Sequence, residues 1–162
     1  MPEITYTRGD ATTPSVKGVK VIAHVCNDSG GWVKGFVLAL SRRWPQPEAS
    51  YRAWHRNRAK NDFGLGAVQL VQVERYVWVA NMIGQRGTRT GSKGVPVRYE
   101  AIDAALERLA VPVRDLGASV HMPRIGCGLA GGTWPRVEPL IAERLVREGI
   151  AVTVYDQGEG LR

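Results

Sequence analysis

Four glycines and one cysteine lie close together in the segment VHMPRIGCGLAGGTW, residues 120–134. The short apolar run at its start predicts a buried strand, and Thr133 followed by Pro135 predicts the first turn of a helix. Glycines let main-chain N–H groups approach a ligand closely, and a helix N-terminus favours negative charge. The segment therefore predicts a loop that binds an anion such as phosphate; the alternative is a flexible connection between strand and helix.

A second glycine-containing loop, CNDSGGWVKG at residues 26–35, follows a continuous apolar run at residues 20–25 that predicts another buried strand. Ligands of parallel sheets bind beyond the carboxyl ends of the strands, where both loops would emerge. Two anion-binding loops at one sheet edge favour a ligand with a diphosphate. Neither loop matches the P-loop or the dinucleotide-binding fingerprint.

Composition limits the classes to which this chain can belong. Its 162 residues suit one domain, with a core over residues 4–156 and a short tail. The net charge of +7 is compatible with a phosphate-rich partner, although surplus arginine also serves solubility. No apolar run is long enough to span a membrane and the first residues do not resemble a signal peptide, so a cytoplasmic location is expected. Cys26 and Cys127 lack metal-binding spacing and are expected to be reduced thiols, with no metal or cofactor.

The elements that would position the two loops alternate along the chain. Strands are expected at residues 3–8, 20–25, 67–73, 76–82, 120–122 and 150–155, with the third and fourth joined as a hairpin. Helices are expected at residues 36–44, 47–54, 97–116 and 134–148, with Gly117 and Gly149 ending the last two. Residues 83–96 are expected to form a long polar loop. The pattern predicts a three-layer α/β/α sandwich with a central mixed, largely parallel sheet.

Four segments resemble the macrodomain family, whose members bind ADP-ribose. They are ITYTRGD near the start, IAHVCND and MPRIGCGL around the two loops, and VTVYD near the end. The resemblance covers residues 4–156. It is strongest to the branch that contains the terminal ADP-ribose protein glycohydrolase and the antitoxin macrodomains that remove ADP-ribose from DNA. It implies the macrodomain fold and ADP-ribose as the ligand.

The resemblance also implies a role for each matching position. Asp10 would accept a hydrogen bond from the adenine amino group beside a main-chain contact from Ala11, although a turn or cap role for Asp10 is the alternative. Asn27 would lie near the distal ribose, and Tyr155 and Asp156 would flank the adenine. The first phosphate loop would comprise Gly30, Gly31, Trp32, Val33, Lys34 and Gly35, with Trp32 the tryptophan expected to touch the ligand. The second phosphate loop would comprise Gly126, Cys127, Gly128, Leu129 and Ala130.

Two positions depart from the eukaryotic glycohydrolase of this branch, in which a lysine attacks the distal ribose and an aspartate assists. Ala130 stands where the aspartate belongs, and Gln85 takes the place of the lysine. Gln85 cannot form a Schiff base, so the covalent route requires Lys34 or Lys93 to reach in from another loop. The chain is therefore expected to be an ADP-ribosyl hydrolase in which ligand phosphate positions a water and Asn27 and Gln85 orient the substrate. The alternatives are a non-catalytic ADP-ribose reader and a general nucleic-acid-binding protein.

The modified macromolecule is expected to be DNA, linked at thymidine, or protein, linked at glutamate or aspartate. Four basic residues of the polar loop could follow a nucleic-acid backbone, although a solvated loop is an equal alternative. These residues are Arg86, Arg89, Lys93 and Arg98.

The remaining reactive side chains are expected to be structural. His24 lies in an apolar strand and is expected to be a core histidine with its hydrogen bonds satisfied. Cys26 and Cys127 are expected to be packing or loop residues, because the sequence places no histidine beside them as an activating base.

Overall fold

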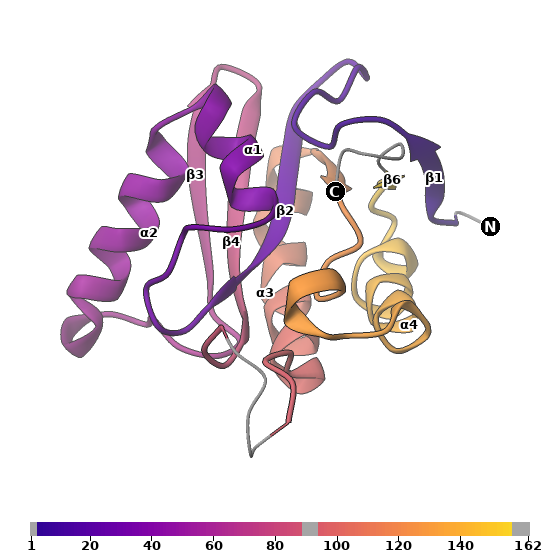
Figure 1. Ribbon diagram of the computed structural model, residues 1–162. Helices are drawn as coiled ribbons and strands as arrows, with labels where there is room; N and C mark the ends of the chain where they lie inside the picture. The colour runs from indigo at the N-terminus through magenta and orange to yellow at the C-terminus, as the bar shows by residue number, and fades with distance from the viewer. Residues whose placement is uncertain (1–2, 89–93, 157–162) are drawn as a thin grey trace.

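A computed structural model describes residues 3–88 and 94–156 of the chain (Figure 1). At its centre is a sheet of six strands in the order β1–β6–β5–β2–β4–β3. The strands are β1 (Thr5–Arg8), β2 (Lys20–Asn27), β3 (Val68–Glu74), β4 (Val77–Gln85), β5 (Ser119–Met122) and β6 (Val152–Asp156). All neighbouring pairs are parallel except β3 and β4, which form the expected hairpin. The predicted mixed, largely parallel sheet is confirmed.

Helices cover both faces of this sheet. On one face lie α1 (Phe36–Arg43) and α2 (Gln46–Arg56), and on the other lie α3 (Tyr99–Leu116) and α4 (Trp134–Arg144) (Figure 1). Three short 3₁₀ turns complete the described structure: η1 (Arg58–Lys60), η2 (Gly128–Ala130) and η3 (Val146–Glu148). The architecture is the predicted three-layer α/β/α sandwich.

Successive side chains of β2 point to opposite faces of the sheet and pack against different layers of helices. Val21 packs into the apolar cluster of α3 and α4, together with Leu106. Ile22 packs into the cluster of α1 and α2, together with Leu40 and Tyr51. Because the strand is buried on both faces, its sequence is a continuous apolar run rather than an alternating one.

Most helix ends fall where the residue types predict. α1 ends just before Trp44 and Pro45, and Gly117 closes α3 with φ +63°, in the left-handed region that favours glycine. Thr133 occupies the N-cap position of α4, but its side chain makes no capping hydrogen bond. The predicted start of this helix is confirmed, although its N-cap residue gives no side-chain hydrogen bond.

Two strands extend two or three residues past their predicted ends. β2 extends to Asn27 and β4 to Gln85, so residues 83–85 belong to the sheet and not to the polar loop. Burial of Ile83 against α1 and α2 holds this end of β4 in place. Asn27 and Gln85 are register partners, so the two candidate catalytic residues end neighbouring strands side by side.

Two predicted features lie partly or wholly outside the described residues. They are the basic loop, at Arg89 and Lys93, and the C-terminal tail at residues 157–162. Within residues 3–88 and 94–156, no helix has the length and apolar character needed to cross a membrane.

Candidate functional site

The two glycine loops meet at the carboxyl edge of the parallel strands. A Cβ atom placed on Gly35 of the first loop would lie 3.3 Å from Cδ1 of Leu129 in the second. The turn after β4 is attached to the first loop, because the Gly87 N–H donates to Asp28 Oδ1 at 2.8 Å. The expected convergence of the loops is thus present in the structure.

Asn27 builds the first loop from within. Its Oδ1 accepts hydrogen bonds from the N–H groups of Ser29 (2.9 Å) and Gly31 (3.0 Å) and from the Tyr51 hydroxyl (2.8 Å). Its Nδ2 donates to the Gly31 carbonyl at 2.9 Å, and the residue is 8% exposed. Both amide atoms are therefore engaged in shaping the loop, and the predicted role of Asn27 in orienting the substrate stays a prediction.

Helix α2 supports the same loop from one side. The Gly30 N–H donates to the Tyr51 hydroxyl at 3.1 Å, and Arg52 Nη1 donates to the Gly30 carbonyl at 3.1 Å. Gly30 has φ +86°, and a Cβ there would lie 2.6 Å from Nδ1 of His55. Only glycine fits this backbone and this space.

The indole of Trp32 is a core group. It is 3% exposed, its Nε1 donates to Ser41 Oγ at 2.8 Å, and its ring packs edge-on against His24 at 5.4 Å. The indole therefore packs in the core, and the expected contact between Trp32 and the ligand stays a prediction. Val33 and Lys34, by contrast, carry exposed side chains.

The second loop folds tightly on its own main chain. The Gly132 N–H donates to the Gly126 carbonyl at 2.8 Å, and a Cβ on Gly132 would lie 2.3 Å from that oxygen. The Ala130 carbonyl accepts from the Val97 N–H at 2.9 Å, which ties the loop to the start of α3. Gly126 and Gly128 have φ +74° and +73°, so the loop needs glycine at both positions.

Several main-chain N–H groups at the meeting point have no protein acceptor. In the described part of the chain, the N–H groups of Val33, Lys34, Gly35 and Leu129 donate to no hydrogen-bond acceptor. The first three lead directly into α1, whose N-terminus has no capping side chain and no acidic residue in its first turn. Unpaired donors at a helix N-terminus form a site for an anion.

The other end of this edge is formed by Asp10 and its surroundings. Asp10 Oδ1 accepts from the N–H and the hydroxyl of Thr12, at 2.8 and 2.7 Å, while Oδ2 has no hydrogen bond among the described residues. Asp10 can therefore hold the turn through Oδ1 and still accept a hydrogen bond from a ligand through Oδ2. Ala11 is buried beside it, and the half-buried Tyr155 hydroxyl is 2.8 Å from His121 Nδ1.

Sequence reasoning gave no role to Arg124. Its guanidinium binds Asp156 through two contacts, with Nη2 to Oδ2 at 3.0 Å, and lies 5.3 and 5.0 Å from the ring centroids of Tyr6 and Trp134. The residue was visible within MPRIGCGL, but nothing in the sequence pairs it with the end of β6. Asp156 is therefore held by an ion pair at the position expected to flank the adenine.

Cys26 and His24 are close but inert. Cys26 Sγ lies 3.7 Å from Nε2 of His24, so the expectation of no neighbouring histidine is wrong. Burial raises the pKa of the Cys26 thiol, and burial lowers the pKa of His24 to about 4, partly offset by its hydrogen bond to Asn81. A neutral thiol beside a neutral imidazole is no nucleophile, and the packing role of both residues stands.

The resemblance places Gln85 and Ala130 where the eukaryotic glycohydrolase has its lysine and aspartate. Gln85 is half-buried and its Nε2 donates to the Gly87 carbonyl at 2.9 Å, while Ala130 is a buried methyl group. No group of three or more potential metal ligands exists within the described residues. Neither Gln85 nor Ala130 supplies a nucleophile or an acid–base group.

The basic residues of the predicted polar loop differ in availability. Arg86 is exposed, next to the turn at Gly87. Arg98 Nη1 donates to the carbonyls of Val95, Pro96 and Val97, so its guanidinium closes its own loop, and its contact with nucleic acid stays a prediction.

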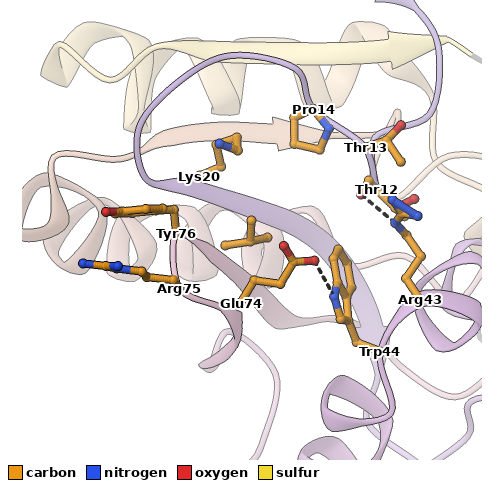
Figure 2. A pocket seen from close by; sticks show the side chains of 10 residues that line it. Thr12, Thr13, Pro14, Lys20, Arg43, Trp44, Glu74, Arg75 and Tyr76 are labelled. Atoms are coloured by element: carbon orange, nitrogen blue, oxygen red, sulfur yellow. Dashed lines mark hydrogen bonds between the residues drawn. The ribbon is translucent and has the colours of Figure 1, made fainter.

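A hollow of about 350 Å³ lies behind the Asp10 turn (Figure 2). Its walls include the Thr12–Pro14 segment and the first residues of β2 and β4, at the edge opposite the glycine loops. Arg43 Nε donates to the Thr12 carbonyl at 3.2 Å, and Trp44 Nε1 donates to Glu74 at 2.9 Å. Arg43 therefore holds the Thr12 carbonyl, and no residue of the two glycine loops lines the hollow.

Comparison with solved structures identifies the family, although no family model matches the chain. A macrodomain protein from Streptomyces coelicolor is 73% identical, with a TM-score of 0.87 over 96% of this chain and 100% of the other. A protein of unknown function from Bacteroides thetaiotaomicron is 56% identical, with a TM-score of 0.92 over 96% and 98% of the two chains. The chain belongs to the macrodomain family.

Curated relatives are more distant. A Danio rerio protein named chromodomain-helicase-DNA-binding protein 1-like is 30% identical over 161 residues, and the chain spans 15% of its length. The ADP-ribose 1''-phosphate phosphatase of Lodderomyces elongisporus is 26% identical over 147 residues, 90% of its length. The DNA ADP-ribosyl glycohydrolase of Thermus aquaticus is 26% identical over 148 residues, 38% of its length.

Proposed function

We propose that this chain binds ADP-ribose and hydrolyses the bond between ADP-ribose and a modified macromolecule. The observation that carries the proposal is the contact between two glycine loops whose N–H groups at Val33, Lys34, Gly35 and Leu129 lack acceptors in the described protein. Such donors fit a diphosphate. Relatives named ADP-ribose 1''-phosphate phosphatase and DNA ADP-ribosyl glycohydrolase support a hydrolase.

The ligand would lie along the carboxyl edge of the sheet. The adenine amino group would donate to Asp10 Oδ2, with Tyr155 and Asp156 beside the ring. The diphosphate would lie between residues 30–35 and 126–130. The distal ribose would reach the loop that Asn27 shapes, next to Gln85.

Hydrolysis would proceed without a protein nucleophile. The bond between the anomeric carbon of the distal ribose and the macromolecule would break, with its electron pair leaving on the macromolecule and a positive charge developing on the sugar. A water held by the ligand's own phosphate would attack that carbon and give its proton to the phosphate or to the departing group. The protein would contribute the fixed loop donors and Gln85, which would orient the ribose or the leaving group. Positioning and preorganised electrostatics supply much of the rate in such sites.

The test is a panel of defined linkages. The protein is incubated with an oligonucleotide carrying ADP-ribose on thymidine and with a protein carrying ADP-ribose on glutamate, and released ADP-ribose is quantified by chromatography. Release is expected from at least one substrate, and Gln85→Ala is expected to lower kcat with a smaller effect on ADP-ribose affinity. Absence of release from both substrates overturns the hydrolase proposal.

A second candidate function is a reader that binds ADP-ribose without cleaving it. Its specific support is that, by the resemblance, Gln85 and Ala130 stand where the branch's glycohydrolase carries its lysine and aspartate. Calorimetry with ADP-ribose is positive under both proposals, so product release decides between them. A calorimetric titration without heat would oppose both and favour a protein with no ADP-ribose site.

A further inference from the structure

Charge is divided unevenly between the two helical layers. The chain carries a net charge of +7, and residues 34–60, which form α1, α2 and η1, contain seven lysines and arginines but one carboxylate, Glu48. Residues 98–149, which include α3 and α4, contain seven arginines and seven carboxylates. Almost all of the excess positive charge therefore lies on one side of the sheet.

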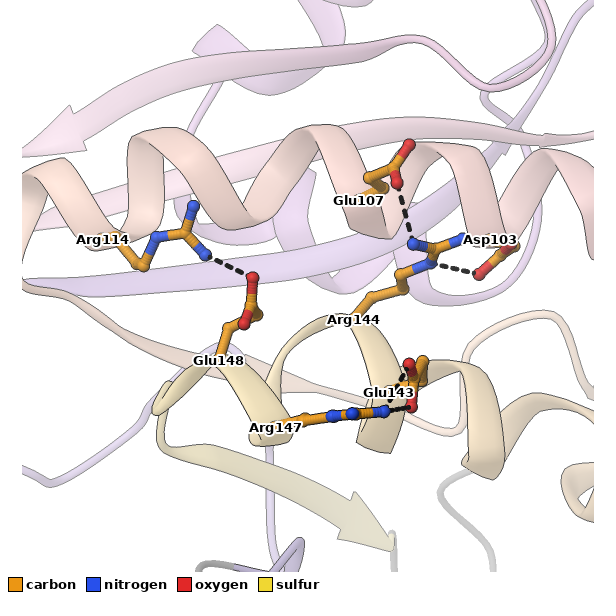
Figure 3. Close-up of polar contacts among 7 residues, drawn as sticks. All are labelled: Asp103, Glu107, Arg114, Glu143, Arg144, Arg147 and Glu148. Atoms are coloured by element: carbon orange, nitrogen blue, oxygen red, sulfur yellow. Dashed lines mark hydrogen bonds and ion pairs between the residues drawn. The ribbon is translucent and has the colours of Figure 1, made fainter.

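The charges on the opposite layer are also paired in space (Figure 3). Arg144 binds Asp103 and Glu107 at 2.8 Å each, and Arg114 binds Glu148 at 3.1 Å. On the α1–α2 layer the ion pair is Arg52 with Glu48. Arg56, Arg58 and Lys60 are exposed and form no ion pair with any described residue, so their field is not neutralised locally.

The basic residues of this layer adjoin the first glycine loop. Arg52 Nη1 holds the Gly30 carbonyl at 3.1 Å, and the His55 ring fills the space beside Gly30. Arg58 Nη1 donates to the His55 carbonyl at 2.8 Å. Arg58 therefore contacts the residue that packs against the loop. On the loop's other side, Thr88 lies 3.6 Å from where a Gly31 Cβ would be, and the exposed Arg86 precedes it in the same turn.

We propose that a basic ridge, defined as Arg52, Arg56, Arg58 and Lys60 with Arg86 across the loop, docks the phosphate backbone of a nucleic-acid strand. The role of the ridge rests on the proposed function, because the strand would be the one whose ADP-ribosylated nucleotide enters the glycine loops. Phosphate contacts fix the register of a strand without reading its sequence. Cations near the C-terminus of α2 also favour the helix dipole, but Arg58 and Lys60 lie beyond the helix.

The test measures binding of unmodified single-stranded DNA by fluorescence anisotropy over a range of salt concentrations, with no ADP-ribose present. Arg56→Gln/Arg58→Gln is compared with Arg114→Gln/Arg147→Gln, which removes the same charge from the balanced layer. The ridge variant is expected to weaken binding and to lower the slope of log affinity against log salt by about 1.4, the value for two lost phosphate contacts. The matched variant is expected to retain the wild-type slope.

Three results would overturn the ridge. They are no salt-dependent binding by the wild type, equal losses in both double variants, or equally tight binding of polyglutamate, which would indicate a surface for any polyanion. Calorimetry with free ADP-ribose separates this proposal from the proposed function. Both double variants are expected to bind free ADP-ribose as the wild type does, so failure of the ridge leaves the ADP-ribose site intact, and failure of the ADP-ribose site leaves the anisotropy result unchanged.

Discussion

The two carboxylate oxygens of Asp10 have different surroundings. Oδ1 accepts the hydrogen bonds of the Thr12 turn, and Oδ2 has no hydrogen bond among the described residues. Asp10→Asn keeps an acceptor for the turn and presents an amide N–H₂ where the adenine amino group would donate. ADP-ribose affinity should fall by about 1.5–3 kcal/mol, since two donors then face each other. Calorimetry measures the affinity and thermal unfolding the stability.

Asp115→Asn, on the opposite layer, is the control for Asp10→Asn. It should change neither affinity nor stability. Unaltered ADP-ribose affinity in Asp10→Asn would rule out the adenine contact and leave Asp10 as a turn residue.

Gly30 is constrained by both backbone and neighbour, with φ +86° and His55 in the space of its missing Cβ. Gly30→Ala should destabilise the fold by about 1–3 kcal/mol, the cost of a strained backbone position. Gly64→Ala is the matched control, because a Cβ there meets nothing within 4 Å. Adding His55→Ala should recover part of the loss; no recovery in chemical denaturation would mean that the backbone alone sets the cost.

At the scale of the element, α2 determines the shape of the first loop through Tyr51. Its hydroxyl accepts from the Gly30 N–H and lies 2.7 Å from the Asn27 carbonyl. Tyr51→Phe leaves these groups unpaired, at a cost of about 1–3 kcal/mol, and should weaken ADP-ribose binding as the loop loosens. Tyr76→Phe, on an exposed tyrosine, should affect neither quantity. Equal effects of the two substitutions in paired calorimetry and unfolding experiments would contradict the prediction.

The elements themselves were largely predictable from the sequence, and their ends were less so. Periodicity and glycine or proline signals located the strands and helices, but residues 83–85 look polar and loop-like because the burial of Ile83 depends on α1 and α2 folding over it. The same limit applies to the site. The glycine loops are local patterns, whereas the burial of Trp32, the use of Asn27 inside its loop and the pairing of Arg124 with Asp156 depend on contacts between distant segments.

For the whole molecule, two buried histidines set the dependence of stability on pH. Burial lowers the pKa of His24 and of His121 to about 4, and Lys20 adds to the effect at His121. Between the ordinary value near 6.5 and about 4, the unfolded chain binds protons that the folded chain does not. The free energy of unfolding should therefore fall as pH falls through this window, by up to about 1.4 kcal/mol per pH unit for each histidine.

Denaturant unfolding at several pH values measures this slope. His121→Gln should flatten it, while His55→Gln, at a half-buried position, should retain most of it. A wild-type slope of zero between pH 6.5 and 4 would contradict the assignment of neutral buried imidazoles.

The edge strand β1 has a consequence for how occupancy of the site can be followed. It is four residues long, exposed throughout, and joined to the sheet through β6 alone, yet Asp10 comes two residues after it. Its amides should exchange with deuterium faster than those of the central strands, because little must open to free them. A nucleotide that binds Asp10 should slow that exchange. Deuterium uptake by a short N-terminal peptide, measured by mass spectrometry, would then report ligand binding without a label on protein or ligand.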